Sequence, residues 1–222
     1  MLAVDIGAES GRVVAADFDG DRLSLEEVKR FPNIPVRLAG SLQWDADRLR
    51  DDVLAGLGGA GEFQAVGIDT WGVDFGLLDR SGNLLGNPGH YRDERTRGMI
   101  ERASERVPRQ EIYRRTGIQF LEINTLYQLL AMVLAGDARL RDADRLLTMP
   151  ALVGRWLTPE SVDEYTDATT TQCYDPVAGA WALDLLGQLG IPTHIFGPVV
   201  QPGTVLGPVR VELNLGTAVV VA

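Results

Sequence analysis

The chain opens on apolar runs separated by turn residues, a pattern that predicts an antiparallel meander. Residues 2–7 form a short apolar run that ends in Asp-Ile-Gly, and a run rich in β-branched residues follows over 12–18. An Asp-Gly-Asp turn at 19–21 leads into a third run over 23–31. Short apolar runs bounded by glycine and aspartate are typical of strands joined by hairpins. We therefore expect three strands at the start of the chain.

The rest of the chain alternates expected helices and strands. A helix is predicted over 45–57, where leucine and valine recur at every fourth residue, and strands are predicted over 63–68 and 73–78. Apolar residues at helical spacing predict further helices at 110–116, 126–135 and 151–157. A connection rich in proline and glycine over 197–208 leads to a last strand at 217–222. This order is found in the ribonuclease-H-like domain of actin-like ATPases, so we expect an α/β fold with a mixed five-stranded sheet and an inserted helical region.

Composition and charge narrow the kind of partner. Of the 222 residues, 45% are hydrophobic, and 31 acidic residues against 21 basic ones give a net charge of -10. A negative chain without a basic block is not expected to bind nucleic acid or an anionic membrane, so a small-molecule substrate fits better. Neither a signal peptide nor an apolar run of about 18 residues is present, and the single cysteine cannot form an internal disulfide. We expect a cytoplasmic protein.

The first candidate site is the turn between the first two predicted strands, from Asp5 to Arg12. Two glycines flank this turn, and successive N–H groups in a glycine turn form a concavity suited to phosphate oxygens. Asp5 would face a metal ion through water, and Arg12 would neutralise phosphate charge. The alternative is a plain β-hairpin in which Glu9, Ser10 and Arg12 are solvated.

The second candidate site lies between the predicted strands at 63–68 and 73–78. Here Asp69, Thr70, Trp71 and Asp74 crowd polar and aromatic groups into a break between two buried runs. A sugar site needs both kinds of group, because the ring face packs on an aromatic surface while the hydroxyls bind carboxylates and backbone groups. A bulged strand pair with Trp71 in the core is the alternative interpretation.

Three further stretches are dense in polar residues but show no catalytic pair. Residues 90–96 read as a solvated helix start, and the runs of Thr, Asn and Gln at 117–128 and 164–172 favour caps and turns. No nucleophile lies at a spacing that suggests a base partner, and His90 and His194 are both far from the cysteine.

Taken together and in order, these stretches resemble a known family. The motifs GIDTWGVDF, YRDERT, GIQF…INTLYQL and EYTDATTTQ are similar to those of the rhamnulokinase branch of the FGGY carbohydrate kinases, and the resemblance runs from Ala3 to Ala222. It implies transfer of the ATP γ-phosphate to the O1 hydroxyl of L-rhamnulose, with Mg²⁺, in a cleft between two actin-like domains.

The resemblance also implies roles for individual residues. The metal would be met by Asp5, and the nucleotide would be lined by Ala8, Glu9, Ser10, Gly11 and Arg12. Gly72 matches a sugar-binding glycine, and its expected neighbours around the sugar are Asp69, Trp71, Asp74, Arg92 and Gln119. Glu9 departs from the family, in which many relatives carry serine. A carboxylate there is unfavourable beside a phosphate unless it points to solvent or serves the metal.

The expected general base and the second domain lie outside the chain. In relatives the aspartate of a Ser-His-Asp-Thr sequence follows a strand like the last one here, so the base is expected just beyond Ala222. We expect the FGGY N-terminal domain over 1–222, with a C-terminal nucleotide-binding domain as its intramolecular partner, and no kinase turnover by this chain alone. The alternatives are a non-catalytic ketose-binding protein and a kinase for another ketose, such as L-fuculose or D-xylulose.

Overall fold

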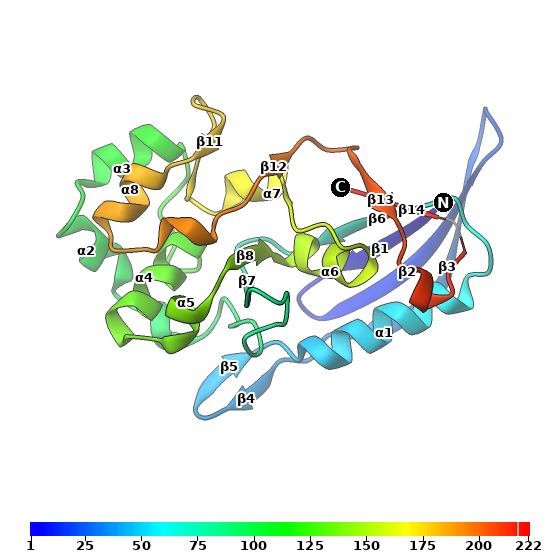
Figure 1. Ribbon diagram of the computed structural model, residues 1–222, viewed down its shortest axis with the longest axis horizontal. Coiled ribbons are helices and arrows are strands. Elements are labelled where there is room, and N and C mark those ends of the chain that lie inside the picture. The colour runs from blue at the N-terminus through cyan, green and yellow to red at the C-terminus, as the bar shows by residue number, and fades with distance from the viewer. Residues whose placement is uncertain (217) are drawn as a thin grey trace.

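The computed structural model, which describes residues 1–216 and 218–222, is built on a mixed six-stranded sheet (Figure 1). The sheet order is β13-β14-β6-β1-β2-β3. In chain order the strands are β1 (Leu2–Ile6), β2 (Ser10–Phe18), β3 (Leu23–Pro32), β6 (Ala65–Thr70), β13 (Val205–Pro208) and β14 (Val219–Val221). The first three pair antiparallel, whereas β6 runs parallel to both β1 and β14. The predicted meander is therefore confirmed.

The sheet differs from the expected one in its last members. The predicted strand over 73–78 does not join it: β7 (Phe75–Leu78) pairs instead with β8 (Arg145–Thr148) in a separate two-stranded ladder. The chain turns between β6 and β7 at Val73, whose φ of 70° takes it out of the extended conformation, and side chains of α4 bind the Val73 carbonyl. The strand expected at 217–222 is found as β14, and Thr217 lies outside the described residues. With β13 added beyond β14, the sheet has six strands where five were expected.

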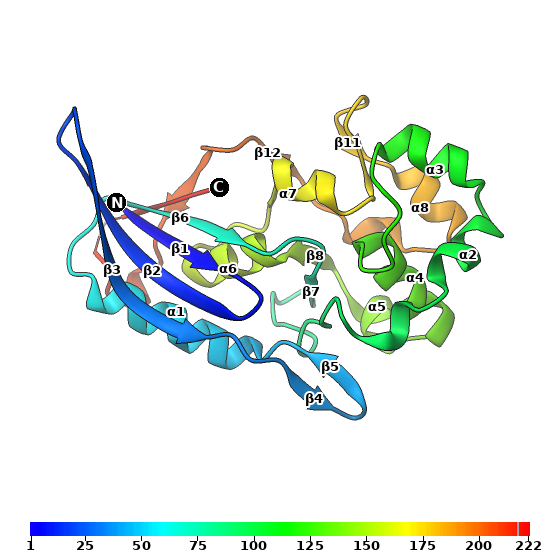
Figure 2. The same ribbon diagram turned by 180° about the vertical axis from the view of Figure 1, so that it is seen from behind.

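Two helices cover one face of the sheet. In α1 (Ala46–Gly59), Asp45 caps the first turn, and Leu49, Val53 and Leu57 are buried at the predicted four-residue spacing. They pack with α6 (Met149–Leu157) against the buried side chains of β1. Figure 2 looks onto the opposite face of the sheet, where alternation along the strands places Asp5 and Asp69. The sheet thus has one covered face and one accessible face.

A helical region forms the second half of the molecule and has its own core. Its centre is α4 (Thr125–Ala135), which is buried from Thr125 to Met132. Around it lie α2 (Met99–Ser104), α3 (Arg109–Thr116), α5 (Ala138–Asp142) and α8 (Leu183–Gln188). The helices predicted at 110–116, 126–135 and 151–157 are confirmed as α3, α4 and α6.

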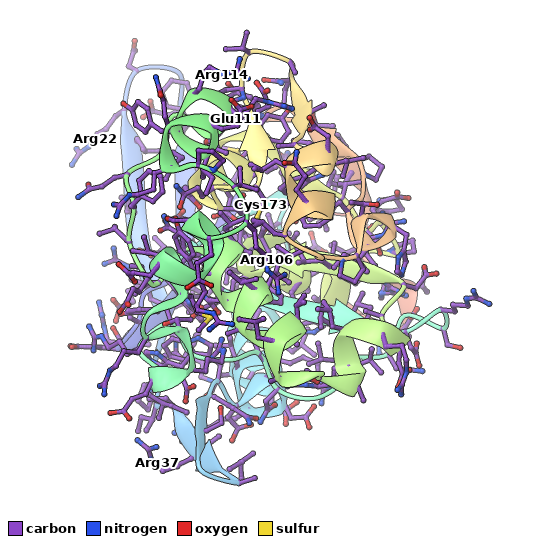
Figure 3. All side chains as sticks on the ribbon, turned by 90° about the vertical axis from the view of Figure 1, so that its left-hand side faces the viewer. Arg22, Arg37, Arg106, Glu111, Arg114 and Cys173 are labelled. Carbon is purple, nitrogen blue, oxygen red and sulfur yellow. The ribbon has the colours of Figure 1, made fainter. Side chains whose placement is uncertain are left out.

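Figure 3 faces this helical half. Glu111 and Arg114 lie on the outer surface of α3, where they form an exposed ion pair, and Arg106 donates a hydrogen bond to the carbonyl of Leu189 after α8. Cys173 lies in the core, and burial raises the pKa of its thiol. An inert structural cysteine is the result.

Short elements complete the chain. They are β4 (Val36–Leu38), β5 (Ser41–Gln43), η1 (Glu94–Thr96), β9 (Asp163–Glu164), α7 (Tyr165–Thr170), β10 (Tyr174–Asp175), β11 (Ala180–Trp181), η2 (Thr193–Ile195), β12 (Val199–Val200) and η3 (Val211–Leu213). The hairpin of β4 and β5 projects below the sheet in Figure 1, and α7 lies between the two halves. Among the described helices, none is both long and apolar enough to cross a membrane.

Candidate functional site

The turn between β1 and β2 is a tight hairpin held by one distant side chain. The Gly7 N–H donates to the Ser10 carbonyl at 2.8 Å, which closes the turn. Asn33, which is buried, donates from its side chain to the Gly7 carbonyl at 2.9 Å and from its backbone to the Glu9 carbonyl at 3.0 Å. Sequence reasoning did not find Asn33, because it lies after β3 and no local pattern links it to the turn. Glu9 itself is exposed.

Gly11 is explained by packing rather than by the approach of a ligand. It is buried on the covered face of the sheet, and a methyl group added there would overlap the ring of Phe31 on β3. A side chain at this position would have to displace a core aromatic ring. The accessible part of the turn is therefore formed by Gly7, Ala8 and Glu9.

Two carboxylates and one arginine lie together on the accessible face. Arg12 Nε donates to Asp5 Oδ2 at 2.7 Å, and both side chains are roughly half exposed. Asp5 is in register with Asp69 on the parallel strand β6, so the two carboxylates are neighbours on one face. No group of three or more His, Cys, Asp or Glu side chains among the described residues could hold a metal ion alone. Mg²⁺ is commonly held by one or two carboxylates together with phosphate oxygens and water, so Asp5 and Asp69 fit a magnesium–nucleotide complex.

A pocket of about 410 Å³ opens where the parallel strands β6 and β14 end. It is named the polar pocket for its one polar wall, because the rest of its lining is apolar, with Ile68, Val162 and Leu206 among its residues. Its polar wall is formed by residues from the end of β6 and from α7, namely Asp69, Thr70, Gly72, Glu164, Thr166, Asp167 and Thr170. A methyl group added at Gly72 would lie 3.1 Å from Thr170 Oγ1 and 3.5 Å from Asp167 Oδ1. Gly72 thus lies against α7, where a side chain would press on Thr170.

The half-buried carboxyl of Asp167 lies at the wall of this pocket, with the buried Asp163 nearby. Asp167 Oδ2 is fully buried and has no hydrogen-bond partner. Burial raises the pKa of Asp167 to about 7. The nearby Thr148 side chain opposes this shift, and the carboxylates of Asp163, Glu164 and Asp69 add to it. Asp163 is completely buried beneath it, and desolvation raises its pKa to about 6. The pocket can therefore hold a neutral carboxylic acid near neutral pH.

Two residues after Gly72 the chain carries a second carboxylate, Asp74, both of whose oxygens accept hydrogen bonds. Asp74 Oδ2 accepts hydrogen bonds from Trp44 Nε1 at 2.6 Å, Trp71 Nε1 at 3.0 Å and the Tyr91 N–H at 3.1 Å. Asp74 Oδ1 accepts from Gln128 Nε2 at 2.8 Å. Desolvation raises the pKa of Asp74 to about 6, against the effect of these donors. Asp74 is 1% exposed, so it organises the core beneath the turn and does not face the polar pocket.

The turn itself is held in an unusual backbone conformation. Val73 has a φ of 70°, which is sterically costly for a β-branched residue. Two side chains of α4 bind its carbonyl: Thr125 Oγ1 donates at 2.7 Å and Gln128 Nε2 at 3.1 Å. Gln128 Nε2 also donates to the Ile123 carbonyl at 2.8 Å. The stretch INTLYQL therefore locks the turn that contains Gly72.

An apolar groove of about 290 Å³ also includes Gly72 in its lining. It is lined by Trp71, Gly72, Val73, Tyr91 and Ile123. The Trp71 ring is packed 4.2 Å from that of the buried Trp44, which in turn stacks on His90 at 4.1 Å. The predicted solvated helix start at 90–96 is therefore only partly solvated, because His90 is buried and desolvation lowers its pKa to about 4.

The structure brings some of the expected sugar residues together and separates others. Asp69, Trp71 and Gly72 meet at the turn, and Asp74 supports Trp71 from below. Arg92 is exposed and lies over the ring of Tyr91, and Gln119 is exposed and lines neither the polar pocket nor the apolar groove. Sequence reasoning did not single out the residues that hold or face the turn from other elements: Thr125, Gln128, Asp163 and Asp167. For Thr125, Gln128 and Asp167 the available signal is the density of polar residues at 117–128 and 164–172, which by local pattern alone predicts caps and turns; Asp163 lies just before the second stretch.

Comparison with known proteins places this architecture in a family. Residues 1–221 match the profile described as the FGGY family of carbohydrate kinases, N-terminal domain. The chain belongs to this FGGY family. A rhamnulokinase of Oceanobacillus iheyensis is 41% identical to this chain, over 96% of this chain and 46% of the relative. A rhamnulokinase of Yersinia pestis is 42% identical, over 93% of this chain and 44% of the relative. The chain thus spans a little under half the length of these relatives.

Solved structures of FGGY kinases share the fold of this chain. A ligand-bound xylulose kinase from Lactobacillus acidophilus has a TM-score of 0.85 at 21% identity, and the match covers 99% of this chain and 46% of the xylulose kinase chain. A glycerol kinase from Plasmodium falciparum with ADP also has a TM-score of 0.85, at 14% identity, and the match covers 100% of this chain and 47% of the glycerol kinase chain. At such identities the likeness concerns the fold alone, and it confirms the predicted actin-like architecture.

Proposed function

We propose that the whole protein of which this FGGY N-terminal domain forms part transfers the γ-phosphate of ATP to O1 of L-rhamnulose, giving L-rhamnulose 1-phosphate in rhamnose catabolism. The observation that carries the proposal is the locked Gly72 turn, which lies next to a polar pocket and three residues after Asp69, the neighbour of Asp5. The rhamnulokinases that are 41% and 42% identical to the chain support this choice of sugar. We also propose that the protein is cytoplasmic.

Asp5 and the hairpin turn would meet the nucleotide. Bound Mg²⁺ would offset charge on the transferring phosphoryl group. Asp5 would hold the metal, and the turn N–H groups of Ala8, Glu9 and Ser10 would face phosphate oxygens. Arg12, now paired with Asp5, is close enough to exchange that carboxylate for a phosphate. Gly11 would serve this loop by letting β2 pack under Phe31.

The sugar would lie across Gly72, where no side chain separates the backbone from a ligand. Asp69 would accept hydrogen bonds from sugar hydroxyls, and Trp71 would offer part of its ring. Asp74 would act through Trp71, whose indole N–H it accepts. Arg92 and Gln119 remain proposed sugar neighbours, and both would have to turn inward from the surface.

The general base that takes the proton from O1 is proposed to lie outside residues 1–222, together with the domain that holds adenosine. The support is the resemblance and the length of the relatives, which are about twice as long as this chain. Residues 1–222 alone would then show no turnover, because positioning and charge neutralisation supply most of phosphoryl-transfer catalysis.

Steady-state kinetics of the whole protein would test the proposal, with ADP release measured while L-rhamnulose and MgATP are varied in turn. Asp5→Asn should lower kcat far more than it raises the KM for the sugar. Gly72→Ala should mainly raise the sugar KM, because the added methyl group meets Thr170 and Asp167. L-fuculose and D-xylulose should be poorer substrates. Binding of L-rhamnulose without any ADP formation would instead indicate a ketose-binding protein.

A further inference from the structure

The turn between β1 and β2 is held by a residue that comes just after the end of β3. This residue is Asn33, which is only 6% exposed. Its side-chain amide, Nδ2, donates to the Gly7 carbonyl at 2.9 Å, and its backbone N–H donates to the Glu9 carbonyl at 3.0 Å. Asn33 therefore holds two carbonyls of the turn at once.

A carbonyl that is held in this way fixes the N–H group on the same peptide. The peptide unit is planar and trans, so its C=O and N–H point in opposite directions. The Gly7 carbonyl shares a peptide with the Ala8 N–H, and the Glu9 carbonyl shares one with the Ser10 N–H. Because both carbonyls point to Asn33, the N–H groups of Ala8 and Ser10 point away from it.

Both of these N–H groups are available to a ligand. Within the described part of the chain, no hydrogen bond from the N–H of Ala8 or of Ser10 is found. Ser10 lies opposite Pro32 in the ladder, and the bond from Asn33 to Glu9 makes this a non-hydrogen-bonded pair. N–H groups of a turn that point outward together form a site for anionic oxygens such as those of phosphate.

We infer that Asn33 is a positioning residue, which orients the N–H groups of Ala8 and Ser10 toward the phosphates of the nucleotide without touching the nucleotide itself. The inference rests on the proposed function, since it concerns the nucleotide of that reaction. Only the bond to Gly7 depends on the Asn33 side chain, because the bond to Glu9 comes from the backbone. Loss of the side chain should therefore release the Ala8 N–H and leave the Ser10 N–H in place.

The test is calorimetric titration of the whole protein with MgATP and, separately, with adenosine, which carries no phosphate. Asn33→Ala should weaken the Kd for MgATP about tenfold, as expected for one hydrogen bond to a charged group, and leave the Kd for adenosine unchanged. Asn33→Leu keeps a branched side chain without the amide and should give the same result, which separates loss of the hydrogen bond from the effect of a cavity. In steady-state kinetics the KM for MgATP should rise while the sugar KM stays constant.

Asn124→Ala is the matched control. Asn124 is also buried, and its Nδ2 donates to a backbone carbonyl, that of Gln119, at 2.9 Å. It lies at the start of α4 in the helical half and makes no hydrogen bond to the β1–β2 turn. Its substitution should leave the ratio of the two Kd values, MgATP to adenosine, as in the parent.

The titrations contain no sugar, so they decide this inference separately from the choice of sugar in the proposed function. If both Asn33 variants bind MgATP as tightly as the parent, or if MgATP and adenosine are weakened to the same extent, Asn33 does not orient the turn and only the inference is overturned. If the parent does not bind MgATP, the proposed function and the inference both fall.

Discussion

Asp74 is a buried carboxyl two residues after Gly72 and Asp167 is a half-buried carboxyl beside Gly72, and they differ in what surrounds them. Asp74 accepts four hydrogen bonds, from two tryptophans, a glutamine and a backbone N–H. Asp167 has one oxygen, Oδ2, that is buried and without a partner. Burial raises the pKa of both, to about 6 for Asp74 and to about 7 for Asp167.

The difference separates a structural carboxylate from one available to a ligand. Four donors offset much of the cost of burying Asp74, and they tie together segments that are distant in sequence. At Asp167 the cost of burying Oδ2 is not offset by any hydrogen bond within the described residues. Gly72, which lies beside Asp167, lines the pocket. An unpartnered buried group beside a cavity is where a substrate hydroxyl can supply the missing hydrogen bond.

The largest expected effect is the removal of the engaged carboxylate. Asp74→Ala would leave Trp44 Nε1, Trp71 Nε1 and Gln128 Nε2 without their acceptor in the core. We expect a loss of about 3–5 kcal/mol in the free energy of unfolding, measured by urea titration. Asp17→Ala, at an exposed position, is the control and should stay within about 0.5 kcal/mol of the parent. A loss under about 1 kcal/mol for Asp74→Ala would contradict the structural role.

Asp167→Asn should not lower the free energy of unfolding as Asp74→Ala does, and its effect on that free energy should depend on pH. The pKa of Asp167 is raised in the folded state, so its contribution to stability is fully present below about pH 4, the unfolded pKa, and is lost as pH rises through about 7. The parent should therefore lose stability between pH 5 and 8, and Asp167→Asn should remove about 2 kcal/mol of that loss.

Asp184 provides the control for this pH dependence. Arg115 lowers the pKa of Asp184 to about 2, so this carboxylate is ionised in both folded and unfolded states across pH 5–8. Asp184→Asn should therefore leave the slope of stability against pH unchanged in that range. An equal change of slope in the two variants would show that Asp167 is not the titrating group.

A smaller effect concerns the turn between the two carboxyls. At Val73 the ordinary ranking of substitutions should invert: Val73→Gly should be more stable than Val73→Ala by about 1 kcal/mol, because alanine keeps the Cβ that is unfavourable at a φ of 70°. Val66, which is buried in β6, should show the normal order, with glycine less stable than alanine. Thermal or urea unfolding of the four variants measures both differences. The same ranking at both positions would contradict a strained turn.

The smallest expected effect is the loss of one of the two hydrogen bonds to the Val73 carbonyl. Thr125→Val removes the hydroxyl that donates at 2.7 Å but keeps the shape of the side chain, and Gln128 still binds the same carbonyl. Stability should fall by about 1 kcal/mol, and the sugar KM of the whole protein should rise while its KM for ATP stays constant. Thr125→Ser restores the hydroxyl and should restore the sugar KM. A parallel change in both KM values would indicate a general loss of packing.

The sequence by itself determined the meander of β1–β3, the helices α1, α3, α4 and α6, and the family, because each depends on local information. Spacing along the chain reports which face of a strand or helix is buried. The motifs that carry the resemblance are likewise contiguous. Local pattern therefore located the segments of the candidate site, including the Gly72 turn.

Only the tertiary structure decided what each polar residue does there. Asp69, Asp74 and Asp167 all lie in polar stretches of similar appearance. Asp74, a predicted neighbour of the sugar, lies in the core, because Trp44 and Gln128, 30 and 54 residues away, supply donors to its oxygens. The pairing of β7 with β8 rather than with the main sheet likewise depended on a turn locked from α4. Burial and hydrogen-bond partners are set by contacts between distant segments, and no local spacing encodes them.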